Sequence, residues 1–265
     1  MKEHILSHIS TECPWRDTLY WYPTTDSTNT RAKELALQGA PHGTVLVAGG
    51  QTEGRGRMGR SFTSPAGMGV YLSVILRPNC TPNQLMHLTC AAAVAAAQAV
   101  EAISGVIPAI KWTNDLVVNG KKLGGILTEL GLNSHGTVDY AIIGIGINCC
   151  QKPEDFPPEL QDMATSVSAL GGRSTSTAEL TAALICSLWQ IDKGLLAAKA
   201  TLMQAYKDRC MTIGQDVVLV QGDQRQYGRA LDLDDDGGLI VKFSDGQVRT
   251  ITFGEISVRG MYGYA

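Results

Sequence analysis

Six short apolar segments between residues 44 and 147 constrain the fold more than any other feature of the sequence. Several are continuous apolar runs of the kind that is buried on both faces of a sheet. The expected strands are 44–48, 69–76, 109–113, 116–118, 125–130 and 140–147. Asn119-Gly120 is a strong signal for a tight hairpin between two of them. Because a hairpin joins antiparallel strands, a strictly alternating parallel fold is excluded.

Three segments, 26–39, 81–105 and 177–208, have apolar residues at helical spacing. The second is the clearest, because Thr81 can cap it, its many alanines favour close packing on a sheet, and Gly105 ends it. Strands and helices are therefore mixed along the chain, which predicts an α+β fold with a mixed central sheet and packed helices.

The rest of the chain predicts a long loop and a β-rich tail. Residues 151–176 are rich in Pro, Ser, Thr and Gly and are interpreted as a surface loop and candidate lid. After Gly214 come short strand patterns, which predict a small β-barrel. The strands are expected at 217–220, 226–231, 239–243 and 248–251, with turns at 222–223, 236–238 and 245–246. We predict two domains, 1–212 and 213–265.

Charge and cysteine usage exclude several classes of protein. The net charge of -3 provides no global basic field for non-specific nucleic-acid binding. Seven cysteines without CxxC spacing and five scattered histidines predict reduced thiols and no metal site built by the protein. The first residues lack the apolar core of a signal peptide, and the most apolar stretch, 90–97, is shorter than the roughly 20 residues that span a bilayer. We expect a cytoplasmic protein without a membrane segment.

The densest chemical signal is the segment 51–60, in which Arg55, Arg57 and Arg60 alternate with glycines between two expected strands. Glycine allows backbone N–H groups close to an anion, and arginine offers a permanently charged fork to phosphate or carboxylate. The segment therefore favours an anion-binding loop. The alternatives are a flexible solvated turn or an RNA-binding segment, although RNA binding is disfavoured by the absence of interleaved aromatic residues.

Two more segments carry polar groups next to apolar strands. The segment 111–115 reads Lys-Trp-Thr-Asn-Asp, and 121–125 reads Lys-Lys-Leu-Gly-Gly. Buried Lys, Asn and Asp side chains are costly unless they bind one another or a ligand, so they are candidate site residues. The alternative is that Asn114-Asp115 only shape a turn while the lysines face solvent. The segment 144–148, Gly-Ile-Gly-Ile-Asn, places glycines where backbone or ligand must approach closely.

Together these segments resemble the biotin protein ligase family. The motifs are Ser-Thr-Asn at 27–29, QxxGRGRxGR at 51–60, KWxNDL at 111–116, KKLGGIL at 121–127 and GIGIN at 144–148. The resemblance covers residues 20–150 densely and extends to a small C-terminal SH3-like barrel. The sequence departs from the family at Thr113, where proline is usual, and at Phe62, where tryptophan is usual. A pocket altered near Thr113 is one consequence to look for.

The resemblance implies site residues position by position. Residues 27–29 and Gln51 would hydrogen-bond the ureido ring of biotin, Asp115 would accept from it, and Trp112 would wall the apolar rings. The implied biotin-binding residues are Ser27, Thr28, Asn29, Gln51, Arg55, Gly56, Arg57, Trp112, Asp115, Lys122 and Gly125. The implied ATP-binding residues are Arg55, Arg57, Arg60, Lys111, Asn114, Lys122 and Asn148, where Asn148 would contact the nucleotide or its Mg²⁺. Lys122 and Arg57 are the implied catalytic residues.

The implied reaction uses MgATP to convert biotin to biotinyl-5'-AMP and then transfers biotin to a lysine of a biotin carboxyl carrier protein. The carrier is the expected partner, and a homodimer is left open. Some family members carry an N-terminal winged helix; here the first motif begins at Ser27, so we expect no DNA binding. Two alternatives remain: a lipoate or octanoate ligase with a similar core, and a non-catalytic nucleotide- or RNA-binding module.

Overall fold

The computed structural model describes residues 1–221, 224–252 and 255–258. A seven-stranded sheet forms its centre, in the order β1-β2-β3-β7-β6-β5-β4. The strands are β1 (Leu19–Tyr22), β2 (Thr44–Ala48), β3 (Gly69–Leu76), β4 (Ala109–Lys111), β5 (Asp115–Val118), β6 (Lys121–Leu132) and β7 (Val138–Asn148). β1 runs parallel to β2, and the other pairs are antiparallel, so the predicted mixed sheet is confirmed.

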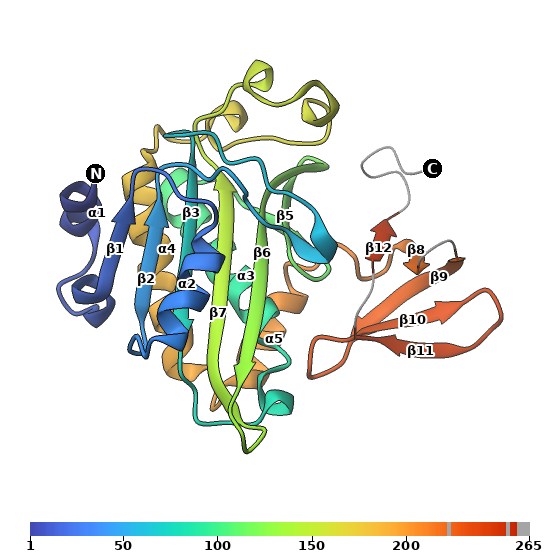
Figure 1. Cartoon of the computed structure of the whole chain (residues 1–265). Helices are drawn as coiled ribbons and strands as arrows, with labels where there is room; N and C mark the ends of the chain where they lie inside the picture. Colours follow the sequence, from blue (N-terminus) through green and yellow to red (C-terminus); the bar gives the residue numbers. More distant parts are fainter. Residues whose placement is uncertain (222–223, 253–254, 259–265) are drawn as a thin grey trace.

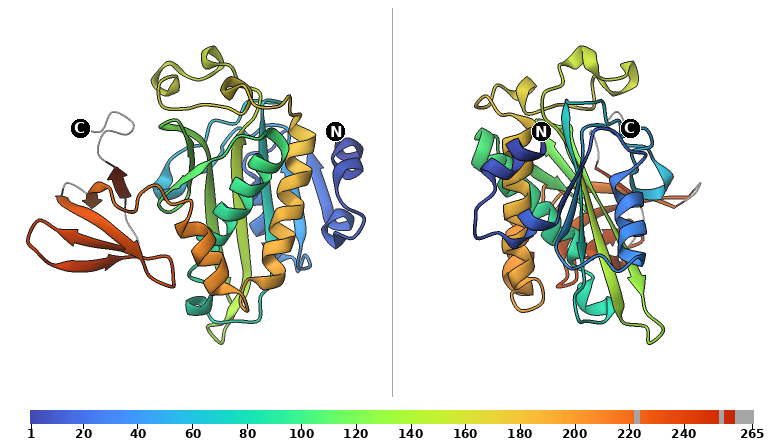
Figure 2. Two further views of the ribbon diagram at one scale, coloured as in Figure 1. Left: turned by 180° about the vertical axis from the view of Figure 1, so that it is seen from behind. Right: turned by 60° about the vertical axis from the view of Figure 1, so that its left-hand side comes forward.

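Helices cover both faces of this sheet and make a three-layer fold (Figures 1 and 2). The helices are α1 (Lys2–His8), α2 (Thr28–Leu37), α3 (Leu88–Ser104), α4 (Thr177–Gly194) and α5 (Lys199–Lys207). α3 and α4 pack against one face, with α5 against α3, and α2 packs against β2, β3 and β7 on the other. Seven of the eight alanines of α3 are buried, all except Ala102, which allows this helix to approach the sheet closely.

The middle of the sheet is buried on both faces because helices lie on both sides. β7 lies between β3 and β6, and ten of its eleven residues are buried or half-buried, as continuous apolar runs predict. The Asn119-Gly120 hairpin joins β5 to β6, with positive φ at both residues (50° and 75°). β6 and β7 are longer than predicted, because they pair with each other as far as Leu132 and Val138.

The predicted helix over 81–105 is wrong in its first turns. Residues Pro82–Leu85 form a short 3-10 helix, closed by a capping box between Thr81 and Gln84, and the α-helix starts only at Leu88. His87 separates the two with non-helical ψ (1°) and is buried. The helix does end at Gly105, which has a left-handed φ of 75°.

The segment 82–104 is long and apolar enough to pass a test for a membrane span, which core helices also pass. About two-thirds (67%) of its most apolar stretch is buried inside this fold. The segment 177–208 likewise forms two helices, α4 and α5, instead of one continuous helical pattern.

The C-terminal part forms an antiparallel sheet of five strands, in the order β11-β10-β9-β8-β12, and the expected small β-domain is confirmed. The strands are β8 (Asp216–Gln221), β9 (Gln224–Leu233), β10 (Leu239–Phe243), β11 (Val248–Ile251) and β12 (Glu255–Val258). The turn predicted at 222–223 lies outside the described residues. The turns at 236–238 and 245–246 are present, each with a glycine at positive φ.

The turn between β9 and β10 packs against the larger part of the molecule. Trp112 Nε1 donates a hydrogen bond to the Gly237 carbonyl oxygen at 2.8 Å. On the same side, Lys199 pairs with Asp236, and Lys207 pairs with Asp232. The boundary that we predict at 212/213 stays a prediction, but these contacts show how the two parts join.

Candidate active site

One cavity collects almost every residue predicted for the site. It encloses about 1010 Å³, counting its open mouth, and lies over β5, β6 and β7 between the N-terminus of α2 and the arginine loop, residues 51–60. It is lined by fourteen of the predicted residues: Ser27, Thr28, Asn29, Gln51, Arg55, Gly56, Arg57, Arg60, Lys111, Trp112, Asn114, Asp115, Lys122 and Gly125. Predicted residues that are as much as 98 positions apart in sequence, from Ser27 to Gly125, thus face one space.

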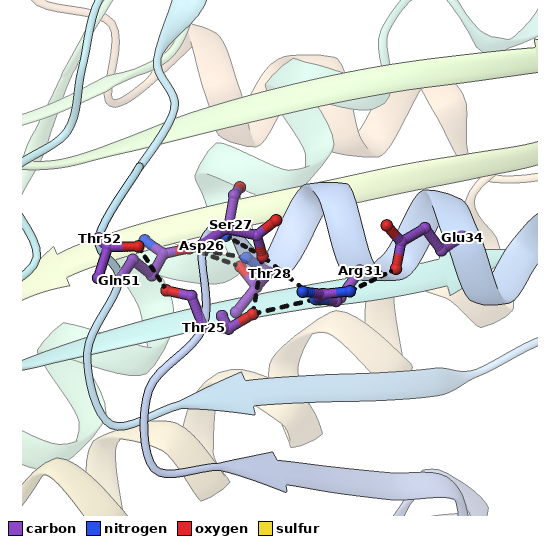
Figure 3. Close-up of polar contacts among 8 residues, drawn as sticks. All are labelled: Thr25, Asp26, Ser27, Thr28, Arg31, Glu34, Gln51 and Thr52. Carbon is purple, nitrogen blue, oxygen red and sulfur yellow. Dashed lines mark hydrogen bonds and ion pairs between the residues drawn. The ribbon is translucent and has the colours of Figure 1, made fainter.

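The Ser-Thr-Asn segment begins α2 and is fixed by a network of hydrogen bonds (Figure 3). Gln51 Oε1 accepts from the Thr28 N–H at 2.8 Å, and Gln51 Nε2 donates to Ser64 Oγ at 2.8 Å. Asp26 Oδ1 accepts from the Ser27 N–H at 2.7 Å and from the Thr25 hydroxyl at 2.8 Å. This first turn of the helix therefore has one well-defined conformation at the cavity wall.

The charge of Asp26 is favoured by this network. Burial alone would raise the pKa of its carboxyl group, but hydrogen bonds from Ser27 and Thr25 and the nearby Arg31 together lower it. Arg31 lies 3.2 Å from Asp26 and 2.8 Å from Glu34 and so extends the network along α2 (Figure 3).

Asn29 is held from three sides and is buried. Its Nδ2 donates to Glu129 Oε2 at 2.8 Å and to the Leu127 carbonyl at 3.3 Å, while its Oδ1 lies 2.7 Å from Ser73 Oγ. Both amide hydrogens are thus engaged, so Asn29 can offer a ligand only the remaining acceptor capacity of Oδ1.

The two glycines of β7 make room for the site. A Cβ on Gly144 would lie 1.9 Å from Asn29 Oδ1, and a Cβ on Gly146 would lie 2.5 Å from the Phe62 ring. The Gly-Ile-Gly pattern therefore reflects close approach by side chains of this chain. Phe62 packs edge-on against Tyr71, with ring centroids 6.5 Å apart, and lines the cavity where the family usually has tryptophan.

The arginine loop lies over the cavity and is bound to two different strands. Arg55 forms a two-pronged ion pair with Glu129 of β6, at 3.1 and 3.0 Å. Arg57 donates to Thr113 Oγ1 at 2.6 Å and to Asn114 Oδ1 at 3.1 Å, in the turn between β4 and β5. Thr113, where the family usually has proline, thus contributes a hydroxyl group that accepts a hydrogen bond from Arg57.

Lys122 and Asp115 meet across the β5–β6 pair. Lys122 Nζ donates to Asp115 Oδ1 at 2.6 Å, and both side chains are mostly buried. Gly125 lies opposite, where an added Cβ would be 3.4 Å from Lys122 Cε. Trp112 forms part of the wall and is 4% exposed, so its ring supplies apolar surface while its indole N–H is used by Gly237.

Asn148 is the exception among the predicted residues. It is buried at the end of β7, and within the described residues it does not line this cavity. Its Nδ2 donates to the Thr165 carbonyl at 3.0 Å and its Oδ1 accepts from Gln151 at 3.2 Å. In this structure Asn148 anchors the 151–176 loop, and a role toward the nucleotide stays a prediction.

The 151–176 loop is attached directly to the site. The Lys122 N–H donates to the Met163 carbonyl at 2.8 Å, and the Thr165 N–H donates to the Lys122 carbonyl at 2.9 Å. Short 3-10 turns shape the loop at Pro153–Asp155, Pro158–Leu160 and Ser168–Leu170. Its function as a lid stays a prediction.

The lining is strongly cationic. Among the described residues it includes three arginines and two lysines but a single carboxylate, that of Asp115. Cationic side chains at the mouth, hydrogen-bonding groups at one end and apolar walls suit a ligand with an anionic end, a polar end and an apolar body. Within the part of the chain that the structure describes, no cluster of three or more His, Cys, Asp or Glu side chains could hold a metal ion.

Sequence reasoning missed several residues that shape the site. The cavity is also lined by Met58, Ser61, Phe62, Ile126, Leu127, Ile145 and Ile256. Behind the lining, Ser73 and Glu129 orient the predicted residues. A polar residue within an apolar strand was the available signal for both, but their partners lie on other elements and cannot be read from local sequence.

Comparison with known proteins decides the family. A model of the biotin/lipoate A/B protein ligase family matches residues 21–148, and a model of the biotin protein ligase C terminal domain matches residues 212–259. The bifunctional ligase/repressor BirA of Bacillus subtilis (strain 168) is 38% identical over 86% of this chain and 70% of its own length. The chain belongs to the biotin protein ligase family. 

Further relatives agree with this assignment. The biotin–acetyl-CoA-carboxylase ligase of Mycobacterium tuberculosis is 33% identical over 88% of this chain and 85% of its own length. The solved biotin protein ligase of Aquifex aeolicus, in complex with biotin and ATP, matches with a TM-score of 0.75 and 29% identity, over 91% of this chain and 98% of that one. The C-terminal match favours a biotin protein ligase over the lipoate or octanoate alternative.

Proposed function

We propose that this biotin protein ligase carries out both half-reactions at the cavity described above. Biotin reacts with MgATP to give biotinyl-5'-AMP and pyrophosphate, and the biotinyl group then passes to a lysine of an acceptor protein. The observation that carries the proposal is the convergence of five cationic side chains with the Ser27–Asn29 turn and Gln51 in one cavity. The arrangement suits a substrate with a polar ring at one end and a carboxylate at the other.

The polar end of the cavity would bind the ureido ring of biotin. Ser27 and Asn29 line this end, and Asn29 is already oriented by Ser73 and Glu129. Trp112 supplies the apolar wall. Preorganisation of this kind reduces the ordering cost of binding a small ligand.

The cationic side chains would bring two anions together. A biotin carboxylate oxygen forms a bond to the α-phosphorus of ATP, the bond from that phosphorus to the bridging oxygen breaks, and pyrophosphate leaves. Arg55, Arg57 and Lys122 offset the charge that accumulates during this step. Mg²⁺ bound to the ATP phosphates supplies additional positive charge. Lys111 and Arg60 also line the cavity and would hold the phosphates.

The second half-reaction needs a neutral lysine amine from the acceptor. This amine forms an amide bond to the biotinyl carbonyl carbon and releases one proton to solvent, the anhydride bond to phosphate breaks, and AMP leaves. The names of the relatives favour a biotin carboxyl carrier domain of a carboxylase as acceptor. Incubation with a purified carrier domain, followed by intact-mass measurement, tests transfer. A cytoplasmic location, homodimer formation and the lack of DNA and membrane binding remain part of the proposal.

The deciding experiment is exchange of labelled pyrophosphate into ATP, with biotin and with lipoate. Exchange with biotin alone is expected, and Lys122→Ala and Arg57→Ala should lower its rate on the order of 10²–10³. Lys121→Ala is the matched control, because Lys121 Nζ binds the Gln161 carbonyl and does not line the cavity. Exchange with lipoate instead would point to the related ligases. Absence of exchange with either acid would overturn the proposed function.

A further inference from the structure

Glu129 stands behind the cavity and contacts two residues that line it from different elements. It lies in β6, and its side chain is 24% exposed. Its Oε2 accepts from Asn29 Nδ2 at 2.8 Å and from Arg55 Nη1 at 3.1 Å, while its Oε1 accepts from Arg55 Nη2 at 3.0 Å. One carboxylate therefore joins the N-terminus of α2 to the arginine loop.

We propose that Glu129 is a positioning residue, an internal anion that seats the arginine loop through Arg55 and orients Asn29 through the same carboxylate. Arg55 is the half-exposed member of the pair, at 44%. The inference rests on the proposed function for the substrates that it names, but its first test does not depend on them.

The shared carboxylate couples the two ends of the cavity. Because Oε2 accepts from both Asn29 and Arg55, the position of the loop and the orientation of the amide depend on each other. Ser73 fixes the opposite side of the amide at 2.7 Å, so the Asn29 oxygen faces one direction only while Glu129 holds the nitrogen. A loop already seated by Glu129 needs less ordering when a substrate anion arrives.

Glu129→Gln is the informative substitution. The size of the side chain is nearly unchanged, but a carboxylate with two acceptor oxygens becomes an amide with one, and its NH₂ group would face a donor. The three hydrogen bonds made by Glu129 cannot all survive. Charge-assisted bonds are the stronger kind, so the loop should loosen and Asn29 should lose its fixed orientation.

The first readout uses limited trypsin digestion of the unliganded protein. Trypsin cleaves after arginine, and the arginine loop contains three, so mass spectrometry of the bonds after Arg55, Arg57 and Arg60 reports how firmly the loop is seated. We expect Glu129→Gln to speed these cleavages several-fold. The matched control is Glu101→Gln, which removes an ion pair with Arg209 on the helical face and should leave cleavage in the loop unchanged.

The second readout is steady-state kinetics of biotin-dependent pyrophosphate exchange. In Glu129→Gln the KM for biotin should rise roughly tenfold, while kcat at saturating biotin changes much less, because the carboxylate positions groups and does not touch the reacting atoms. Glu129→Asp keeps the charge but withdraws it by one methylene, and it should fall between wild type and Glu129→Gln in both readouts.

Unchanged tryptic cleavage or an unchanged KM in Glu129→Gln would overturn the inference. If this variant fails to fold, Arg55→Gln tests the same ion pair from the exposed loop and should speed cleavage after Arg57. Failure of wild type to catalyse exchange with biotin would instead count against the proposed function, and the digestion of unliganded protein would still decide the role of Glu129.

Discussion

Single residues in this structure owe their roles to partners from other elements. His87 is an example outside the site: it is fully buried between the 3-10 turn and α3, and its Nε2 donates to the Leu195 carbonyl at 2.7 Å. Its Nδ1 has no partner among the described residues. Burial lowers the pKa of its imidazole, with nearby Lys199 adding to this effect, while the Leu195 hydrogen bond and Asp236 oppose it.

Because the pKa of His87 is lower in the folded protein, the unfolded chain binds a proton first as the pH falls. The stabilising contribution of neutral His87 is complete above about pH 6.5, the ordinary value, and is lost as the pH falls toward the folded-state pKa. We expect the urea concentration at the midpoint of unfolding to decrease as the pH is lowered from 7.5 to 5.5. The decrease should be smaller in His87→Gln, whose side chain can still donate to the Leu195 carbonyl.

His135→Gln is the control for this titration, since His135 is exposed in the turn between β6 and β7 and the variant should keep the wild-type pH dependence. If His87→Gln lost as much stability on acidification as wild type, His87 would not be a source of the pH dependence.

Single residues also show what the sequence could predict about the site. Fourteen predicted residues line the cavity, because each belongs to a motif that specifies both the type of side chain and its position in the chain. Glu129 and Ser73 were missed, since each acts through a partner more than 40 positions away. Asn148 was predicted from its motif alone; its amide contacts Gln151 and Thr165, and its role toward the nucleotide stays a prediction.

At the scale of elements, α2 and β7 approach each other so closely that β7 has room only for glycine at position 144. Gly144→Ala would place a methyl group 1.9 Å from Asn29 Oδ1. We expect a loss of about 1–3 kcal/mol in the free energy of unfolding, typical of overpacking, together with a higher KM for biotin. Chemical denaturation and pyrophosphate exchange measure the two effects.

A second substitution separates the clash from the chemistry. Adding Asn29→Ala to Gly144→Ala removes the clashing atom, so the double variant should lose less stability than the sum of the two single variants, while the KM stays high. Gly125→Ala is the control for stability, because its Cβ would meet nothing closer than 3.4 Å. If Gly144→Ala were as stable as wild type, the contact between α2 and β7 would not be as close as described.

Elements were predicted best where one physical signal dominates. β2 and β3 agree with their predicted limits, because apolar runs between turn residues define them. β1 and α1 were missed: four residues of β1 and a polar seven-residue helix carry too little periodicity, and their places are set by contact with β2 and α4. The helix limit at 81 was wrong because a capping box can close a 3-10 turn as well as an α-helix.

At the scale of the whole molecule, the small β-domain packs onto the large one through a turn with little free space. Gly237 has a φ of 87°, and a Cβ there would lie 2.7 Å from Cys90 Sγ of α3. Cys90 is buried, and burial raises the pKa of its thiol to about 12. While the two parts remain packed, Cys90 should therefore react very slowly with alkylating reagents.

Gly237→Ala is expected to disturb this contact and expose Cys90. Iodoacetamide labelling followed by peptide mass spectrometry should show Cys90 modified faster than in wild type. Gly246→Ala is the matched control: its φ of 84° gives a similar backbone strain, but no atom lies within 4 Å of the added Cβ. That variant should lose stability while Cys90 stays protected, and equal labelling of Cys90 in both variants would contradict the role of the contact.

The cavity lining includes Ile256 of β12 as well as Ser27 at the start of α2. During translation, the segments that carry the chemistry leave the ribosome long before β12 does. A nascent chain can assemble its central sheet and still lack the part of the cavity lining that Ile256 contributes. Full enclosure of a ligand therefore has to wait until β12 has been synthesised and has paired with β8.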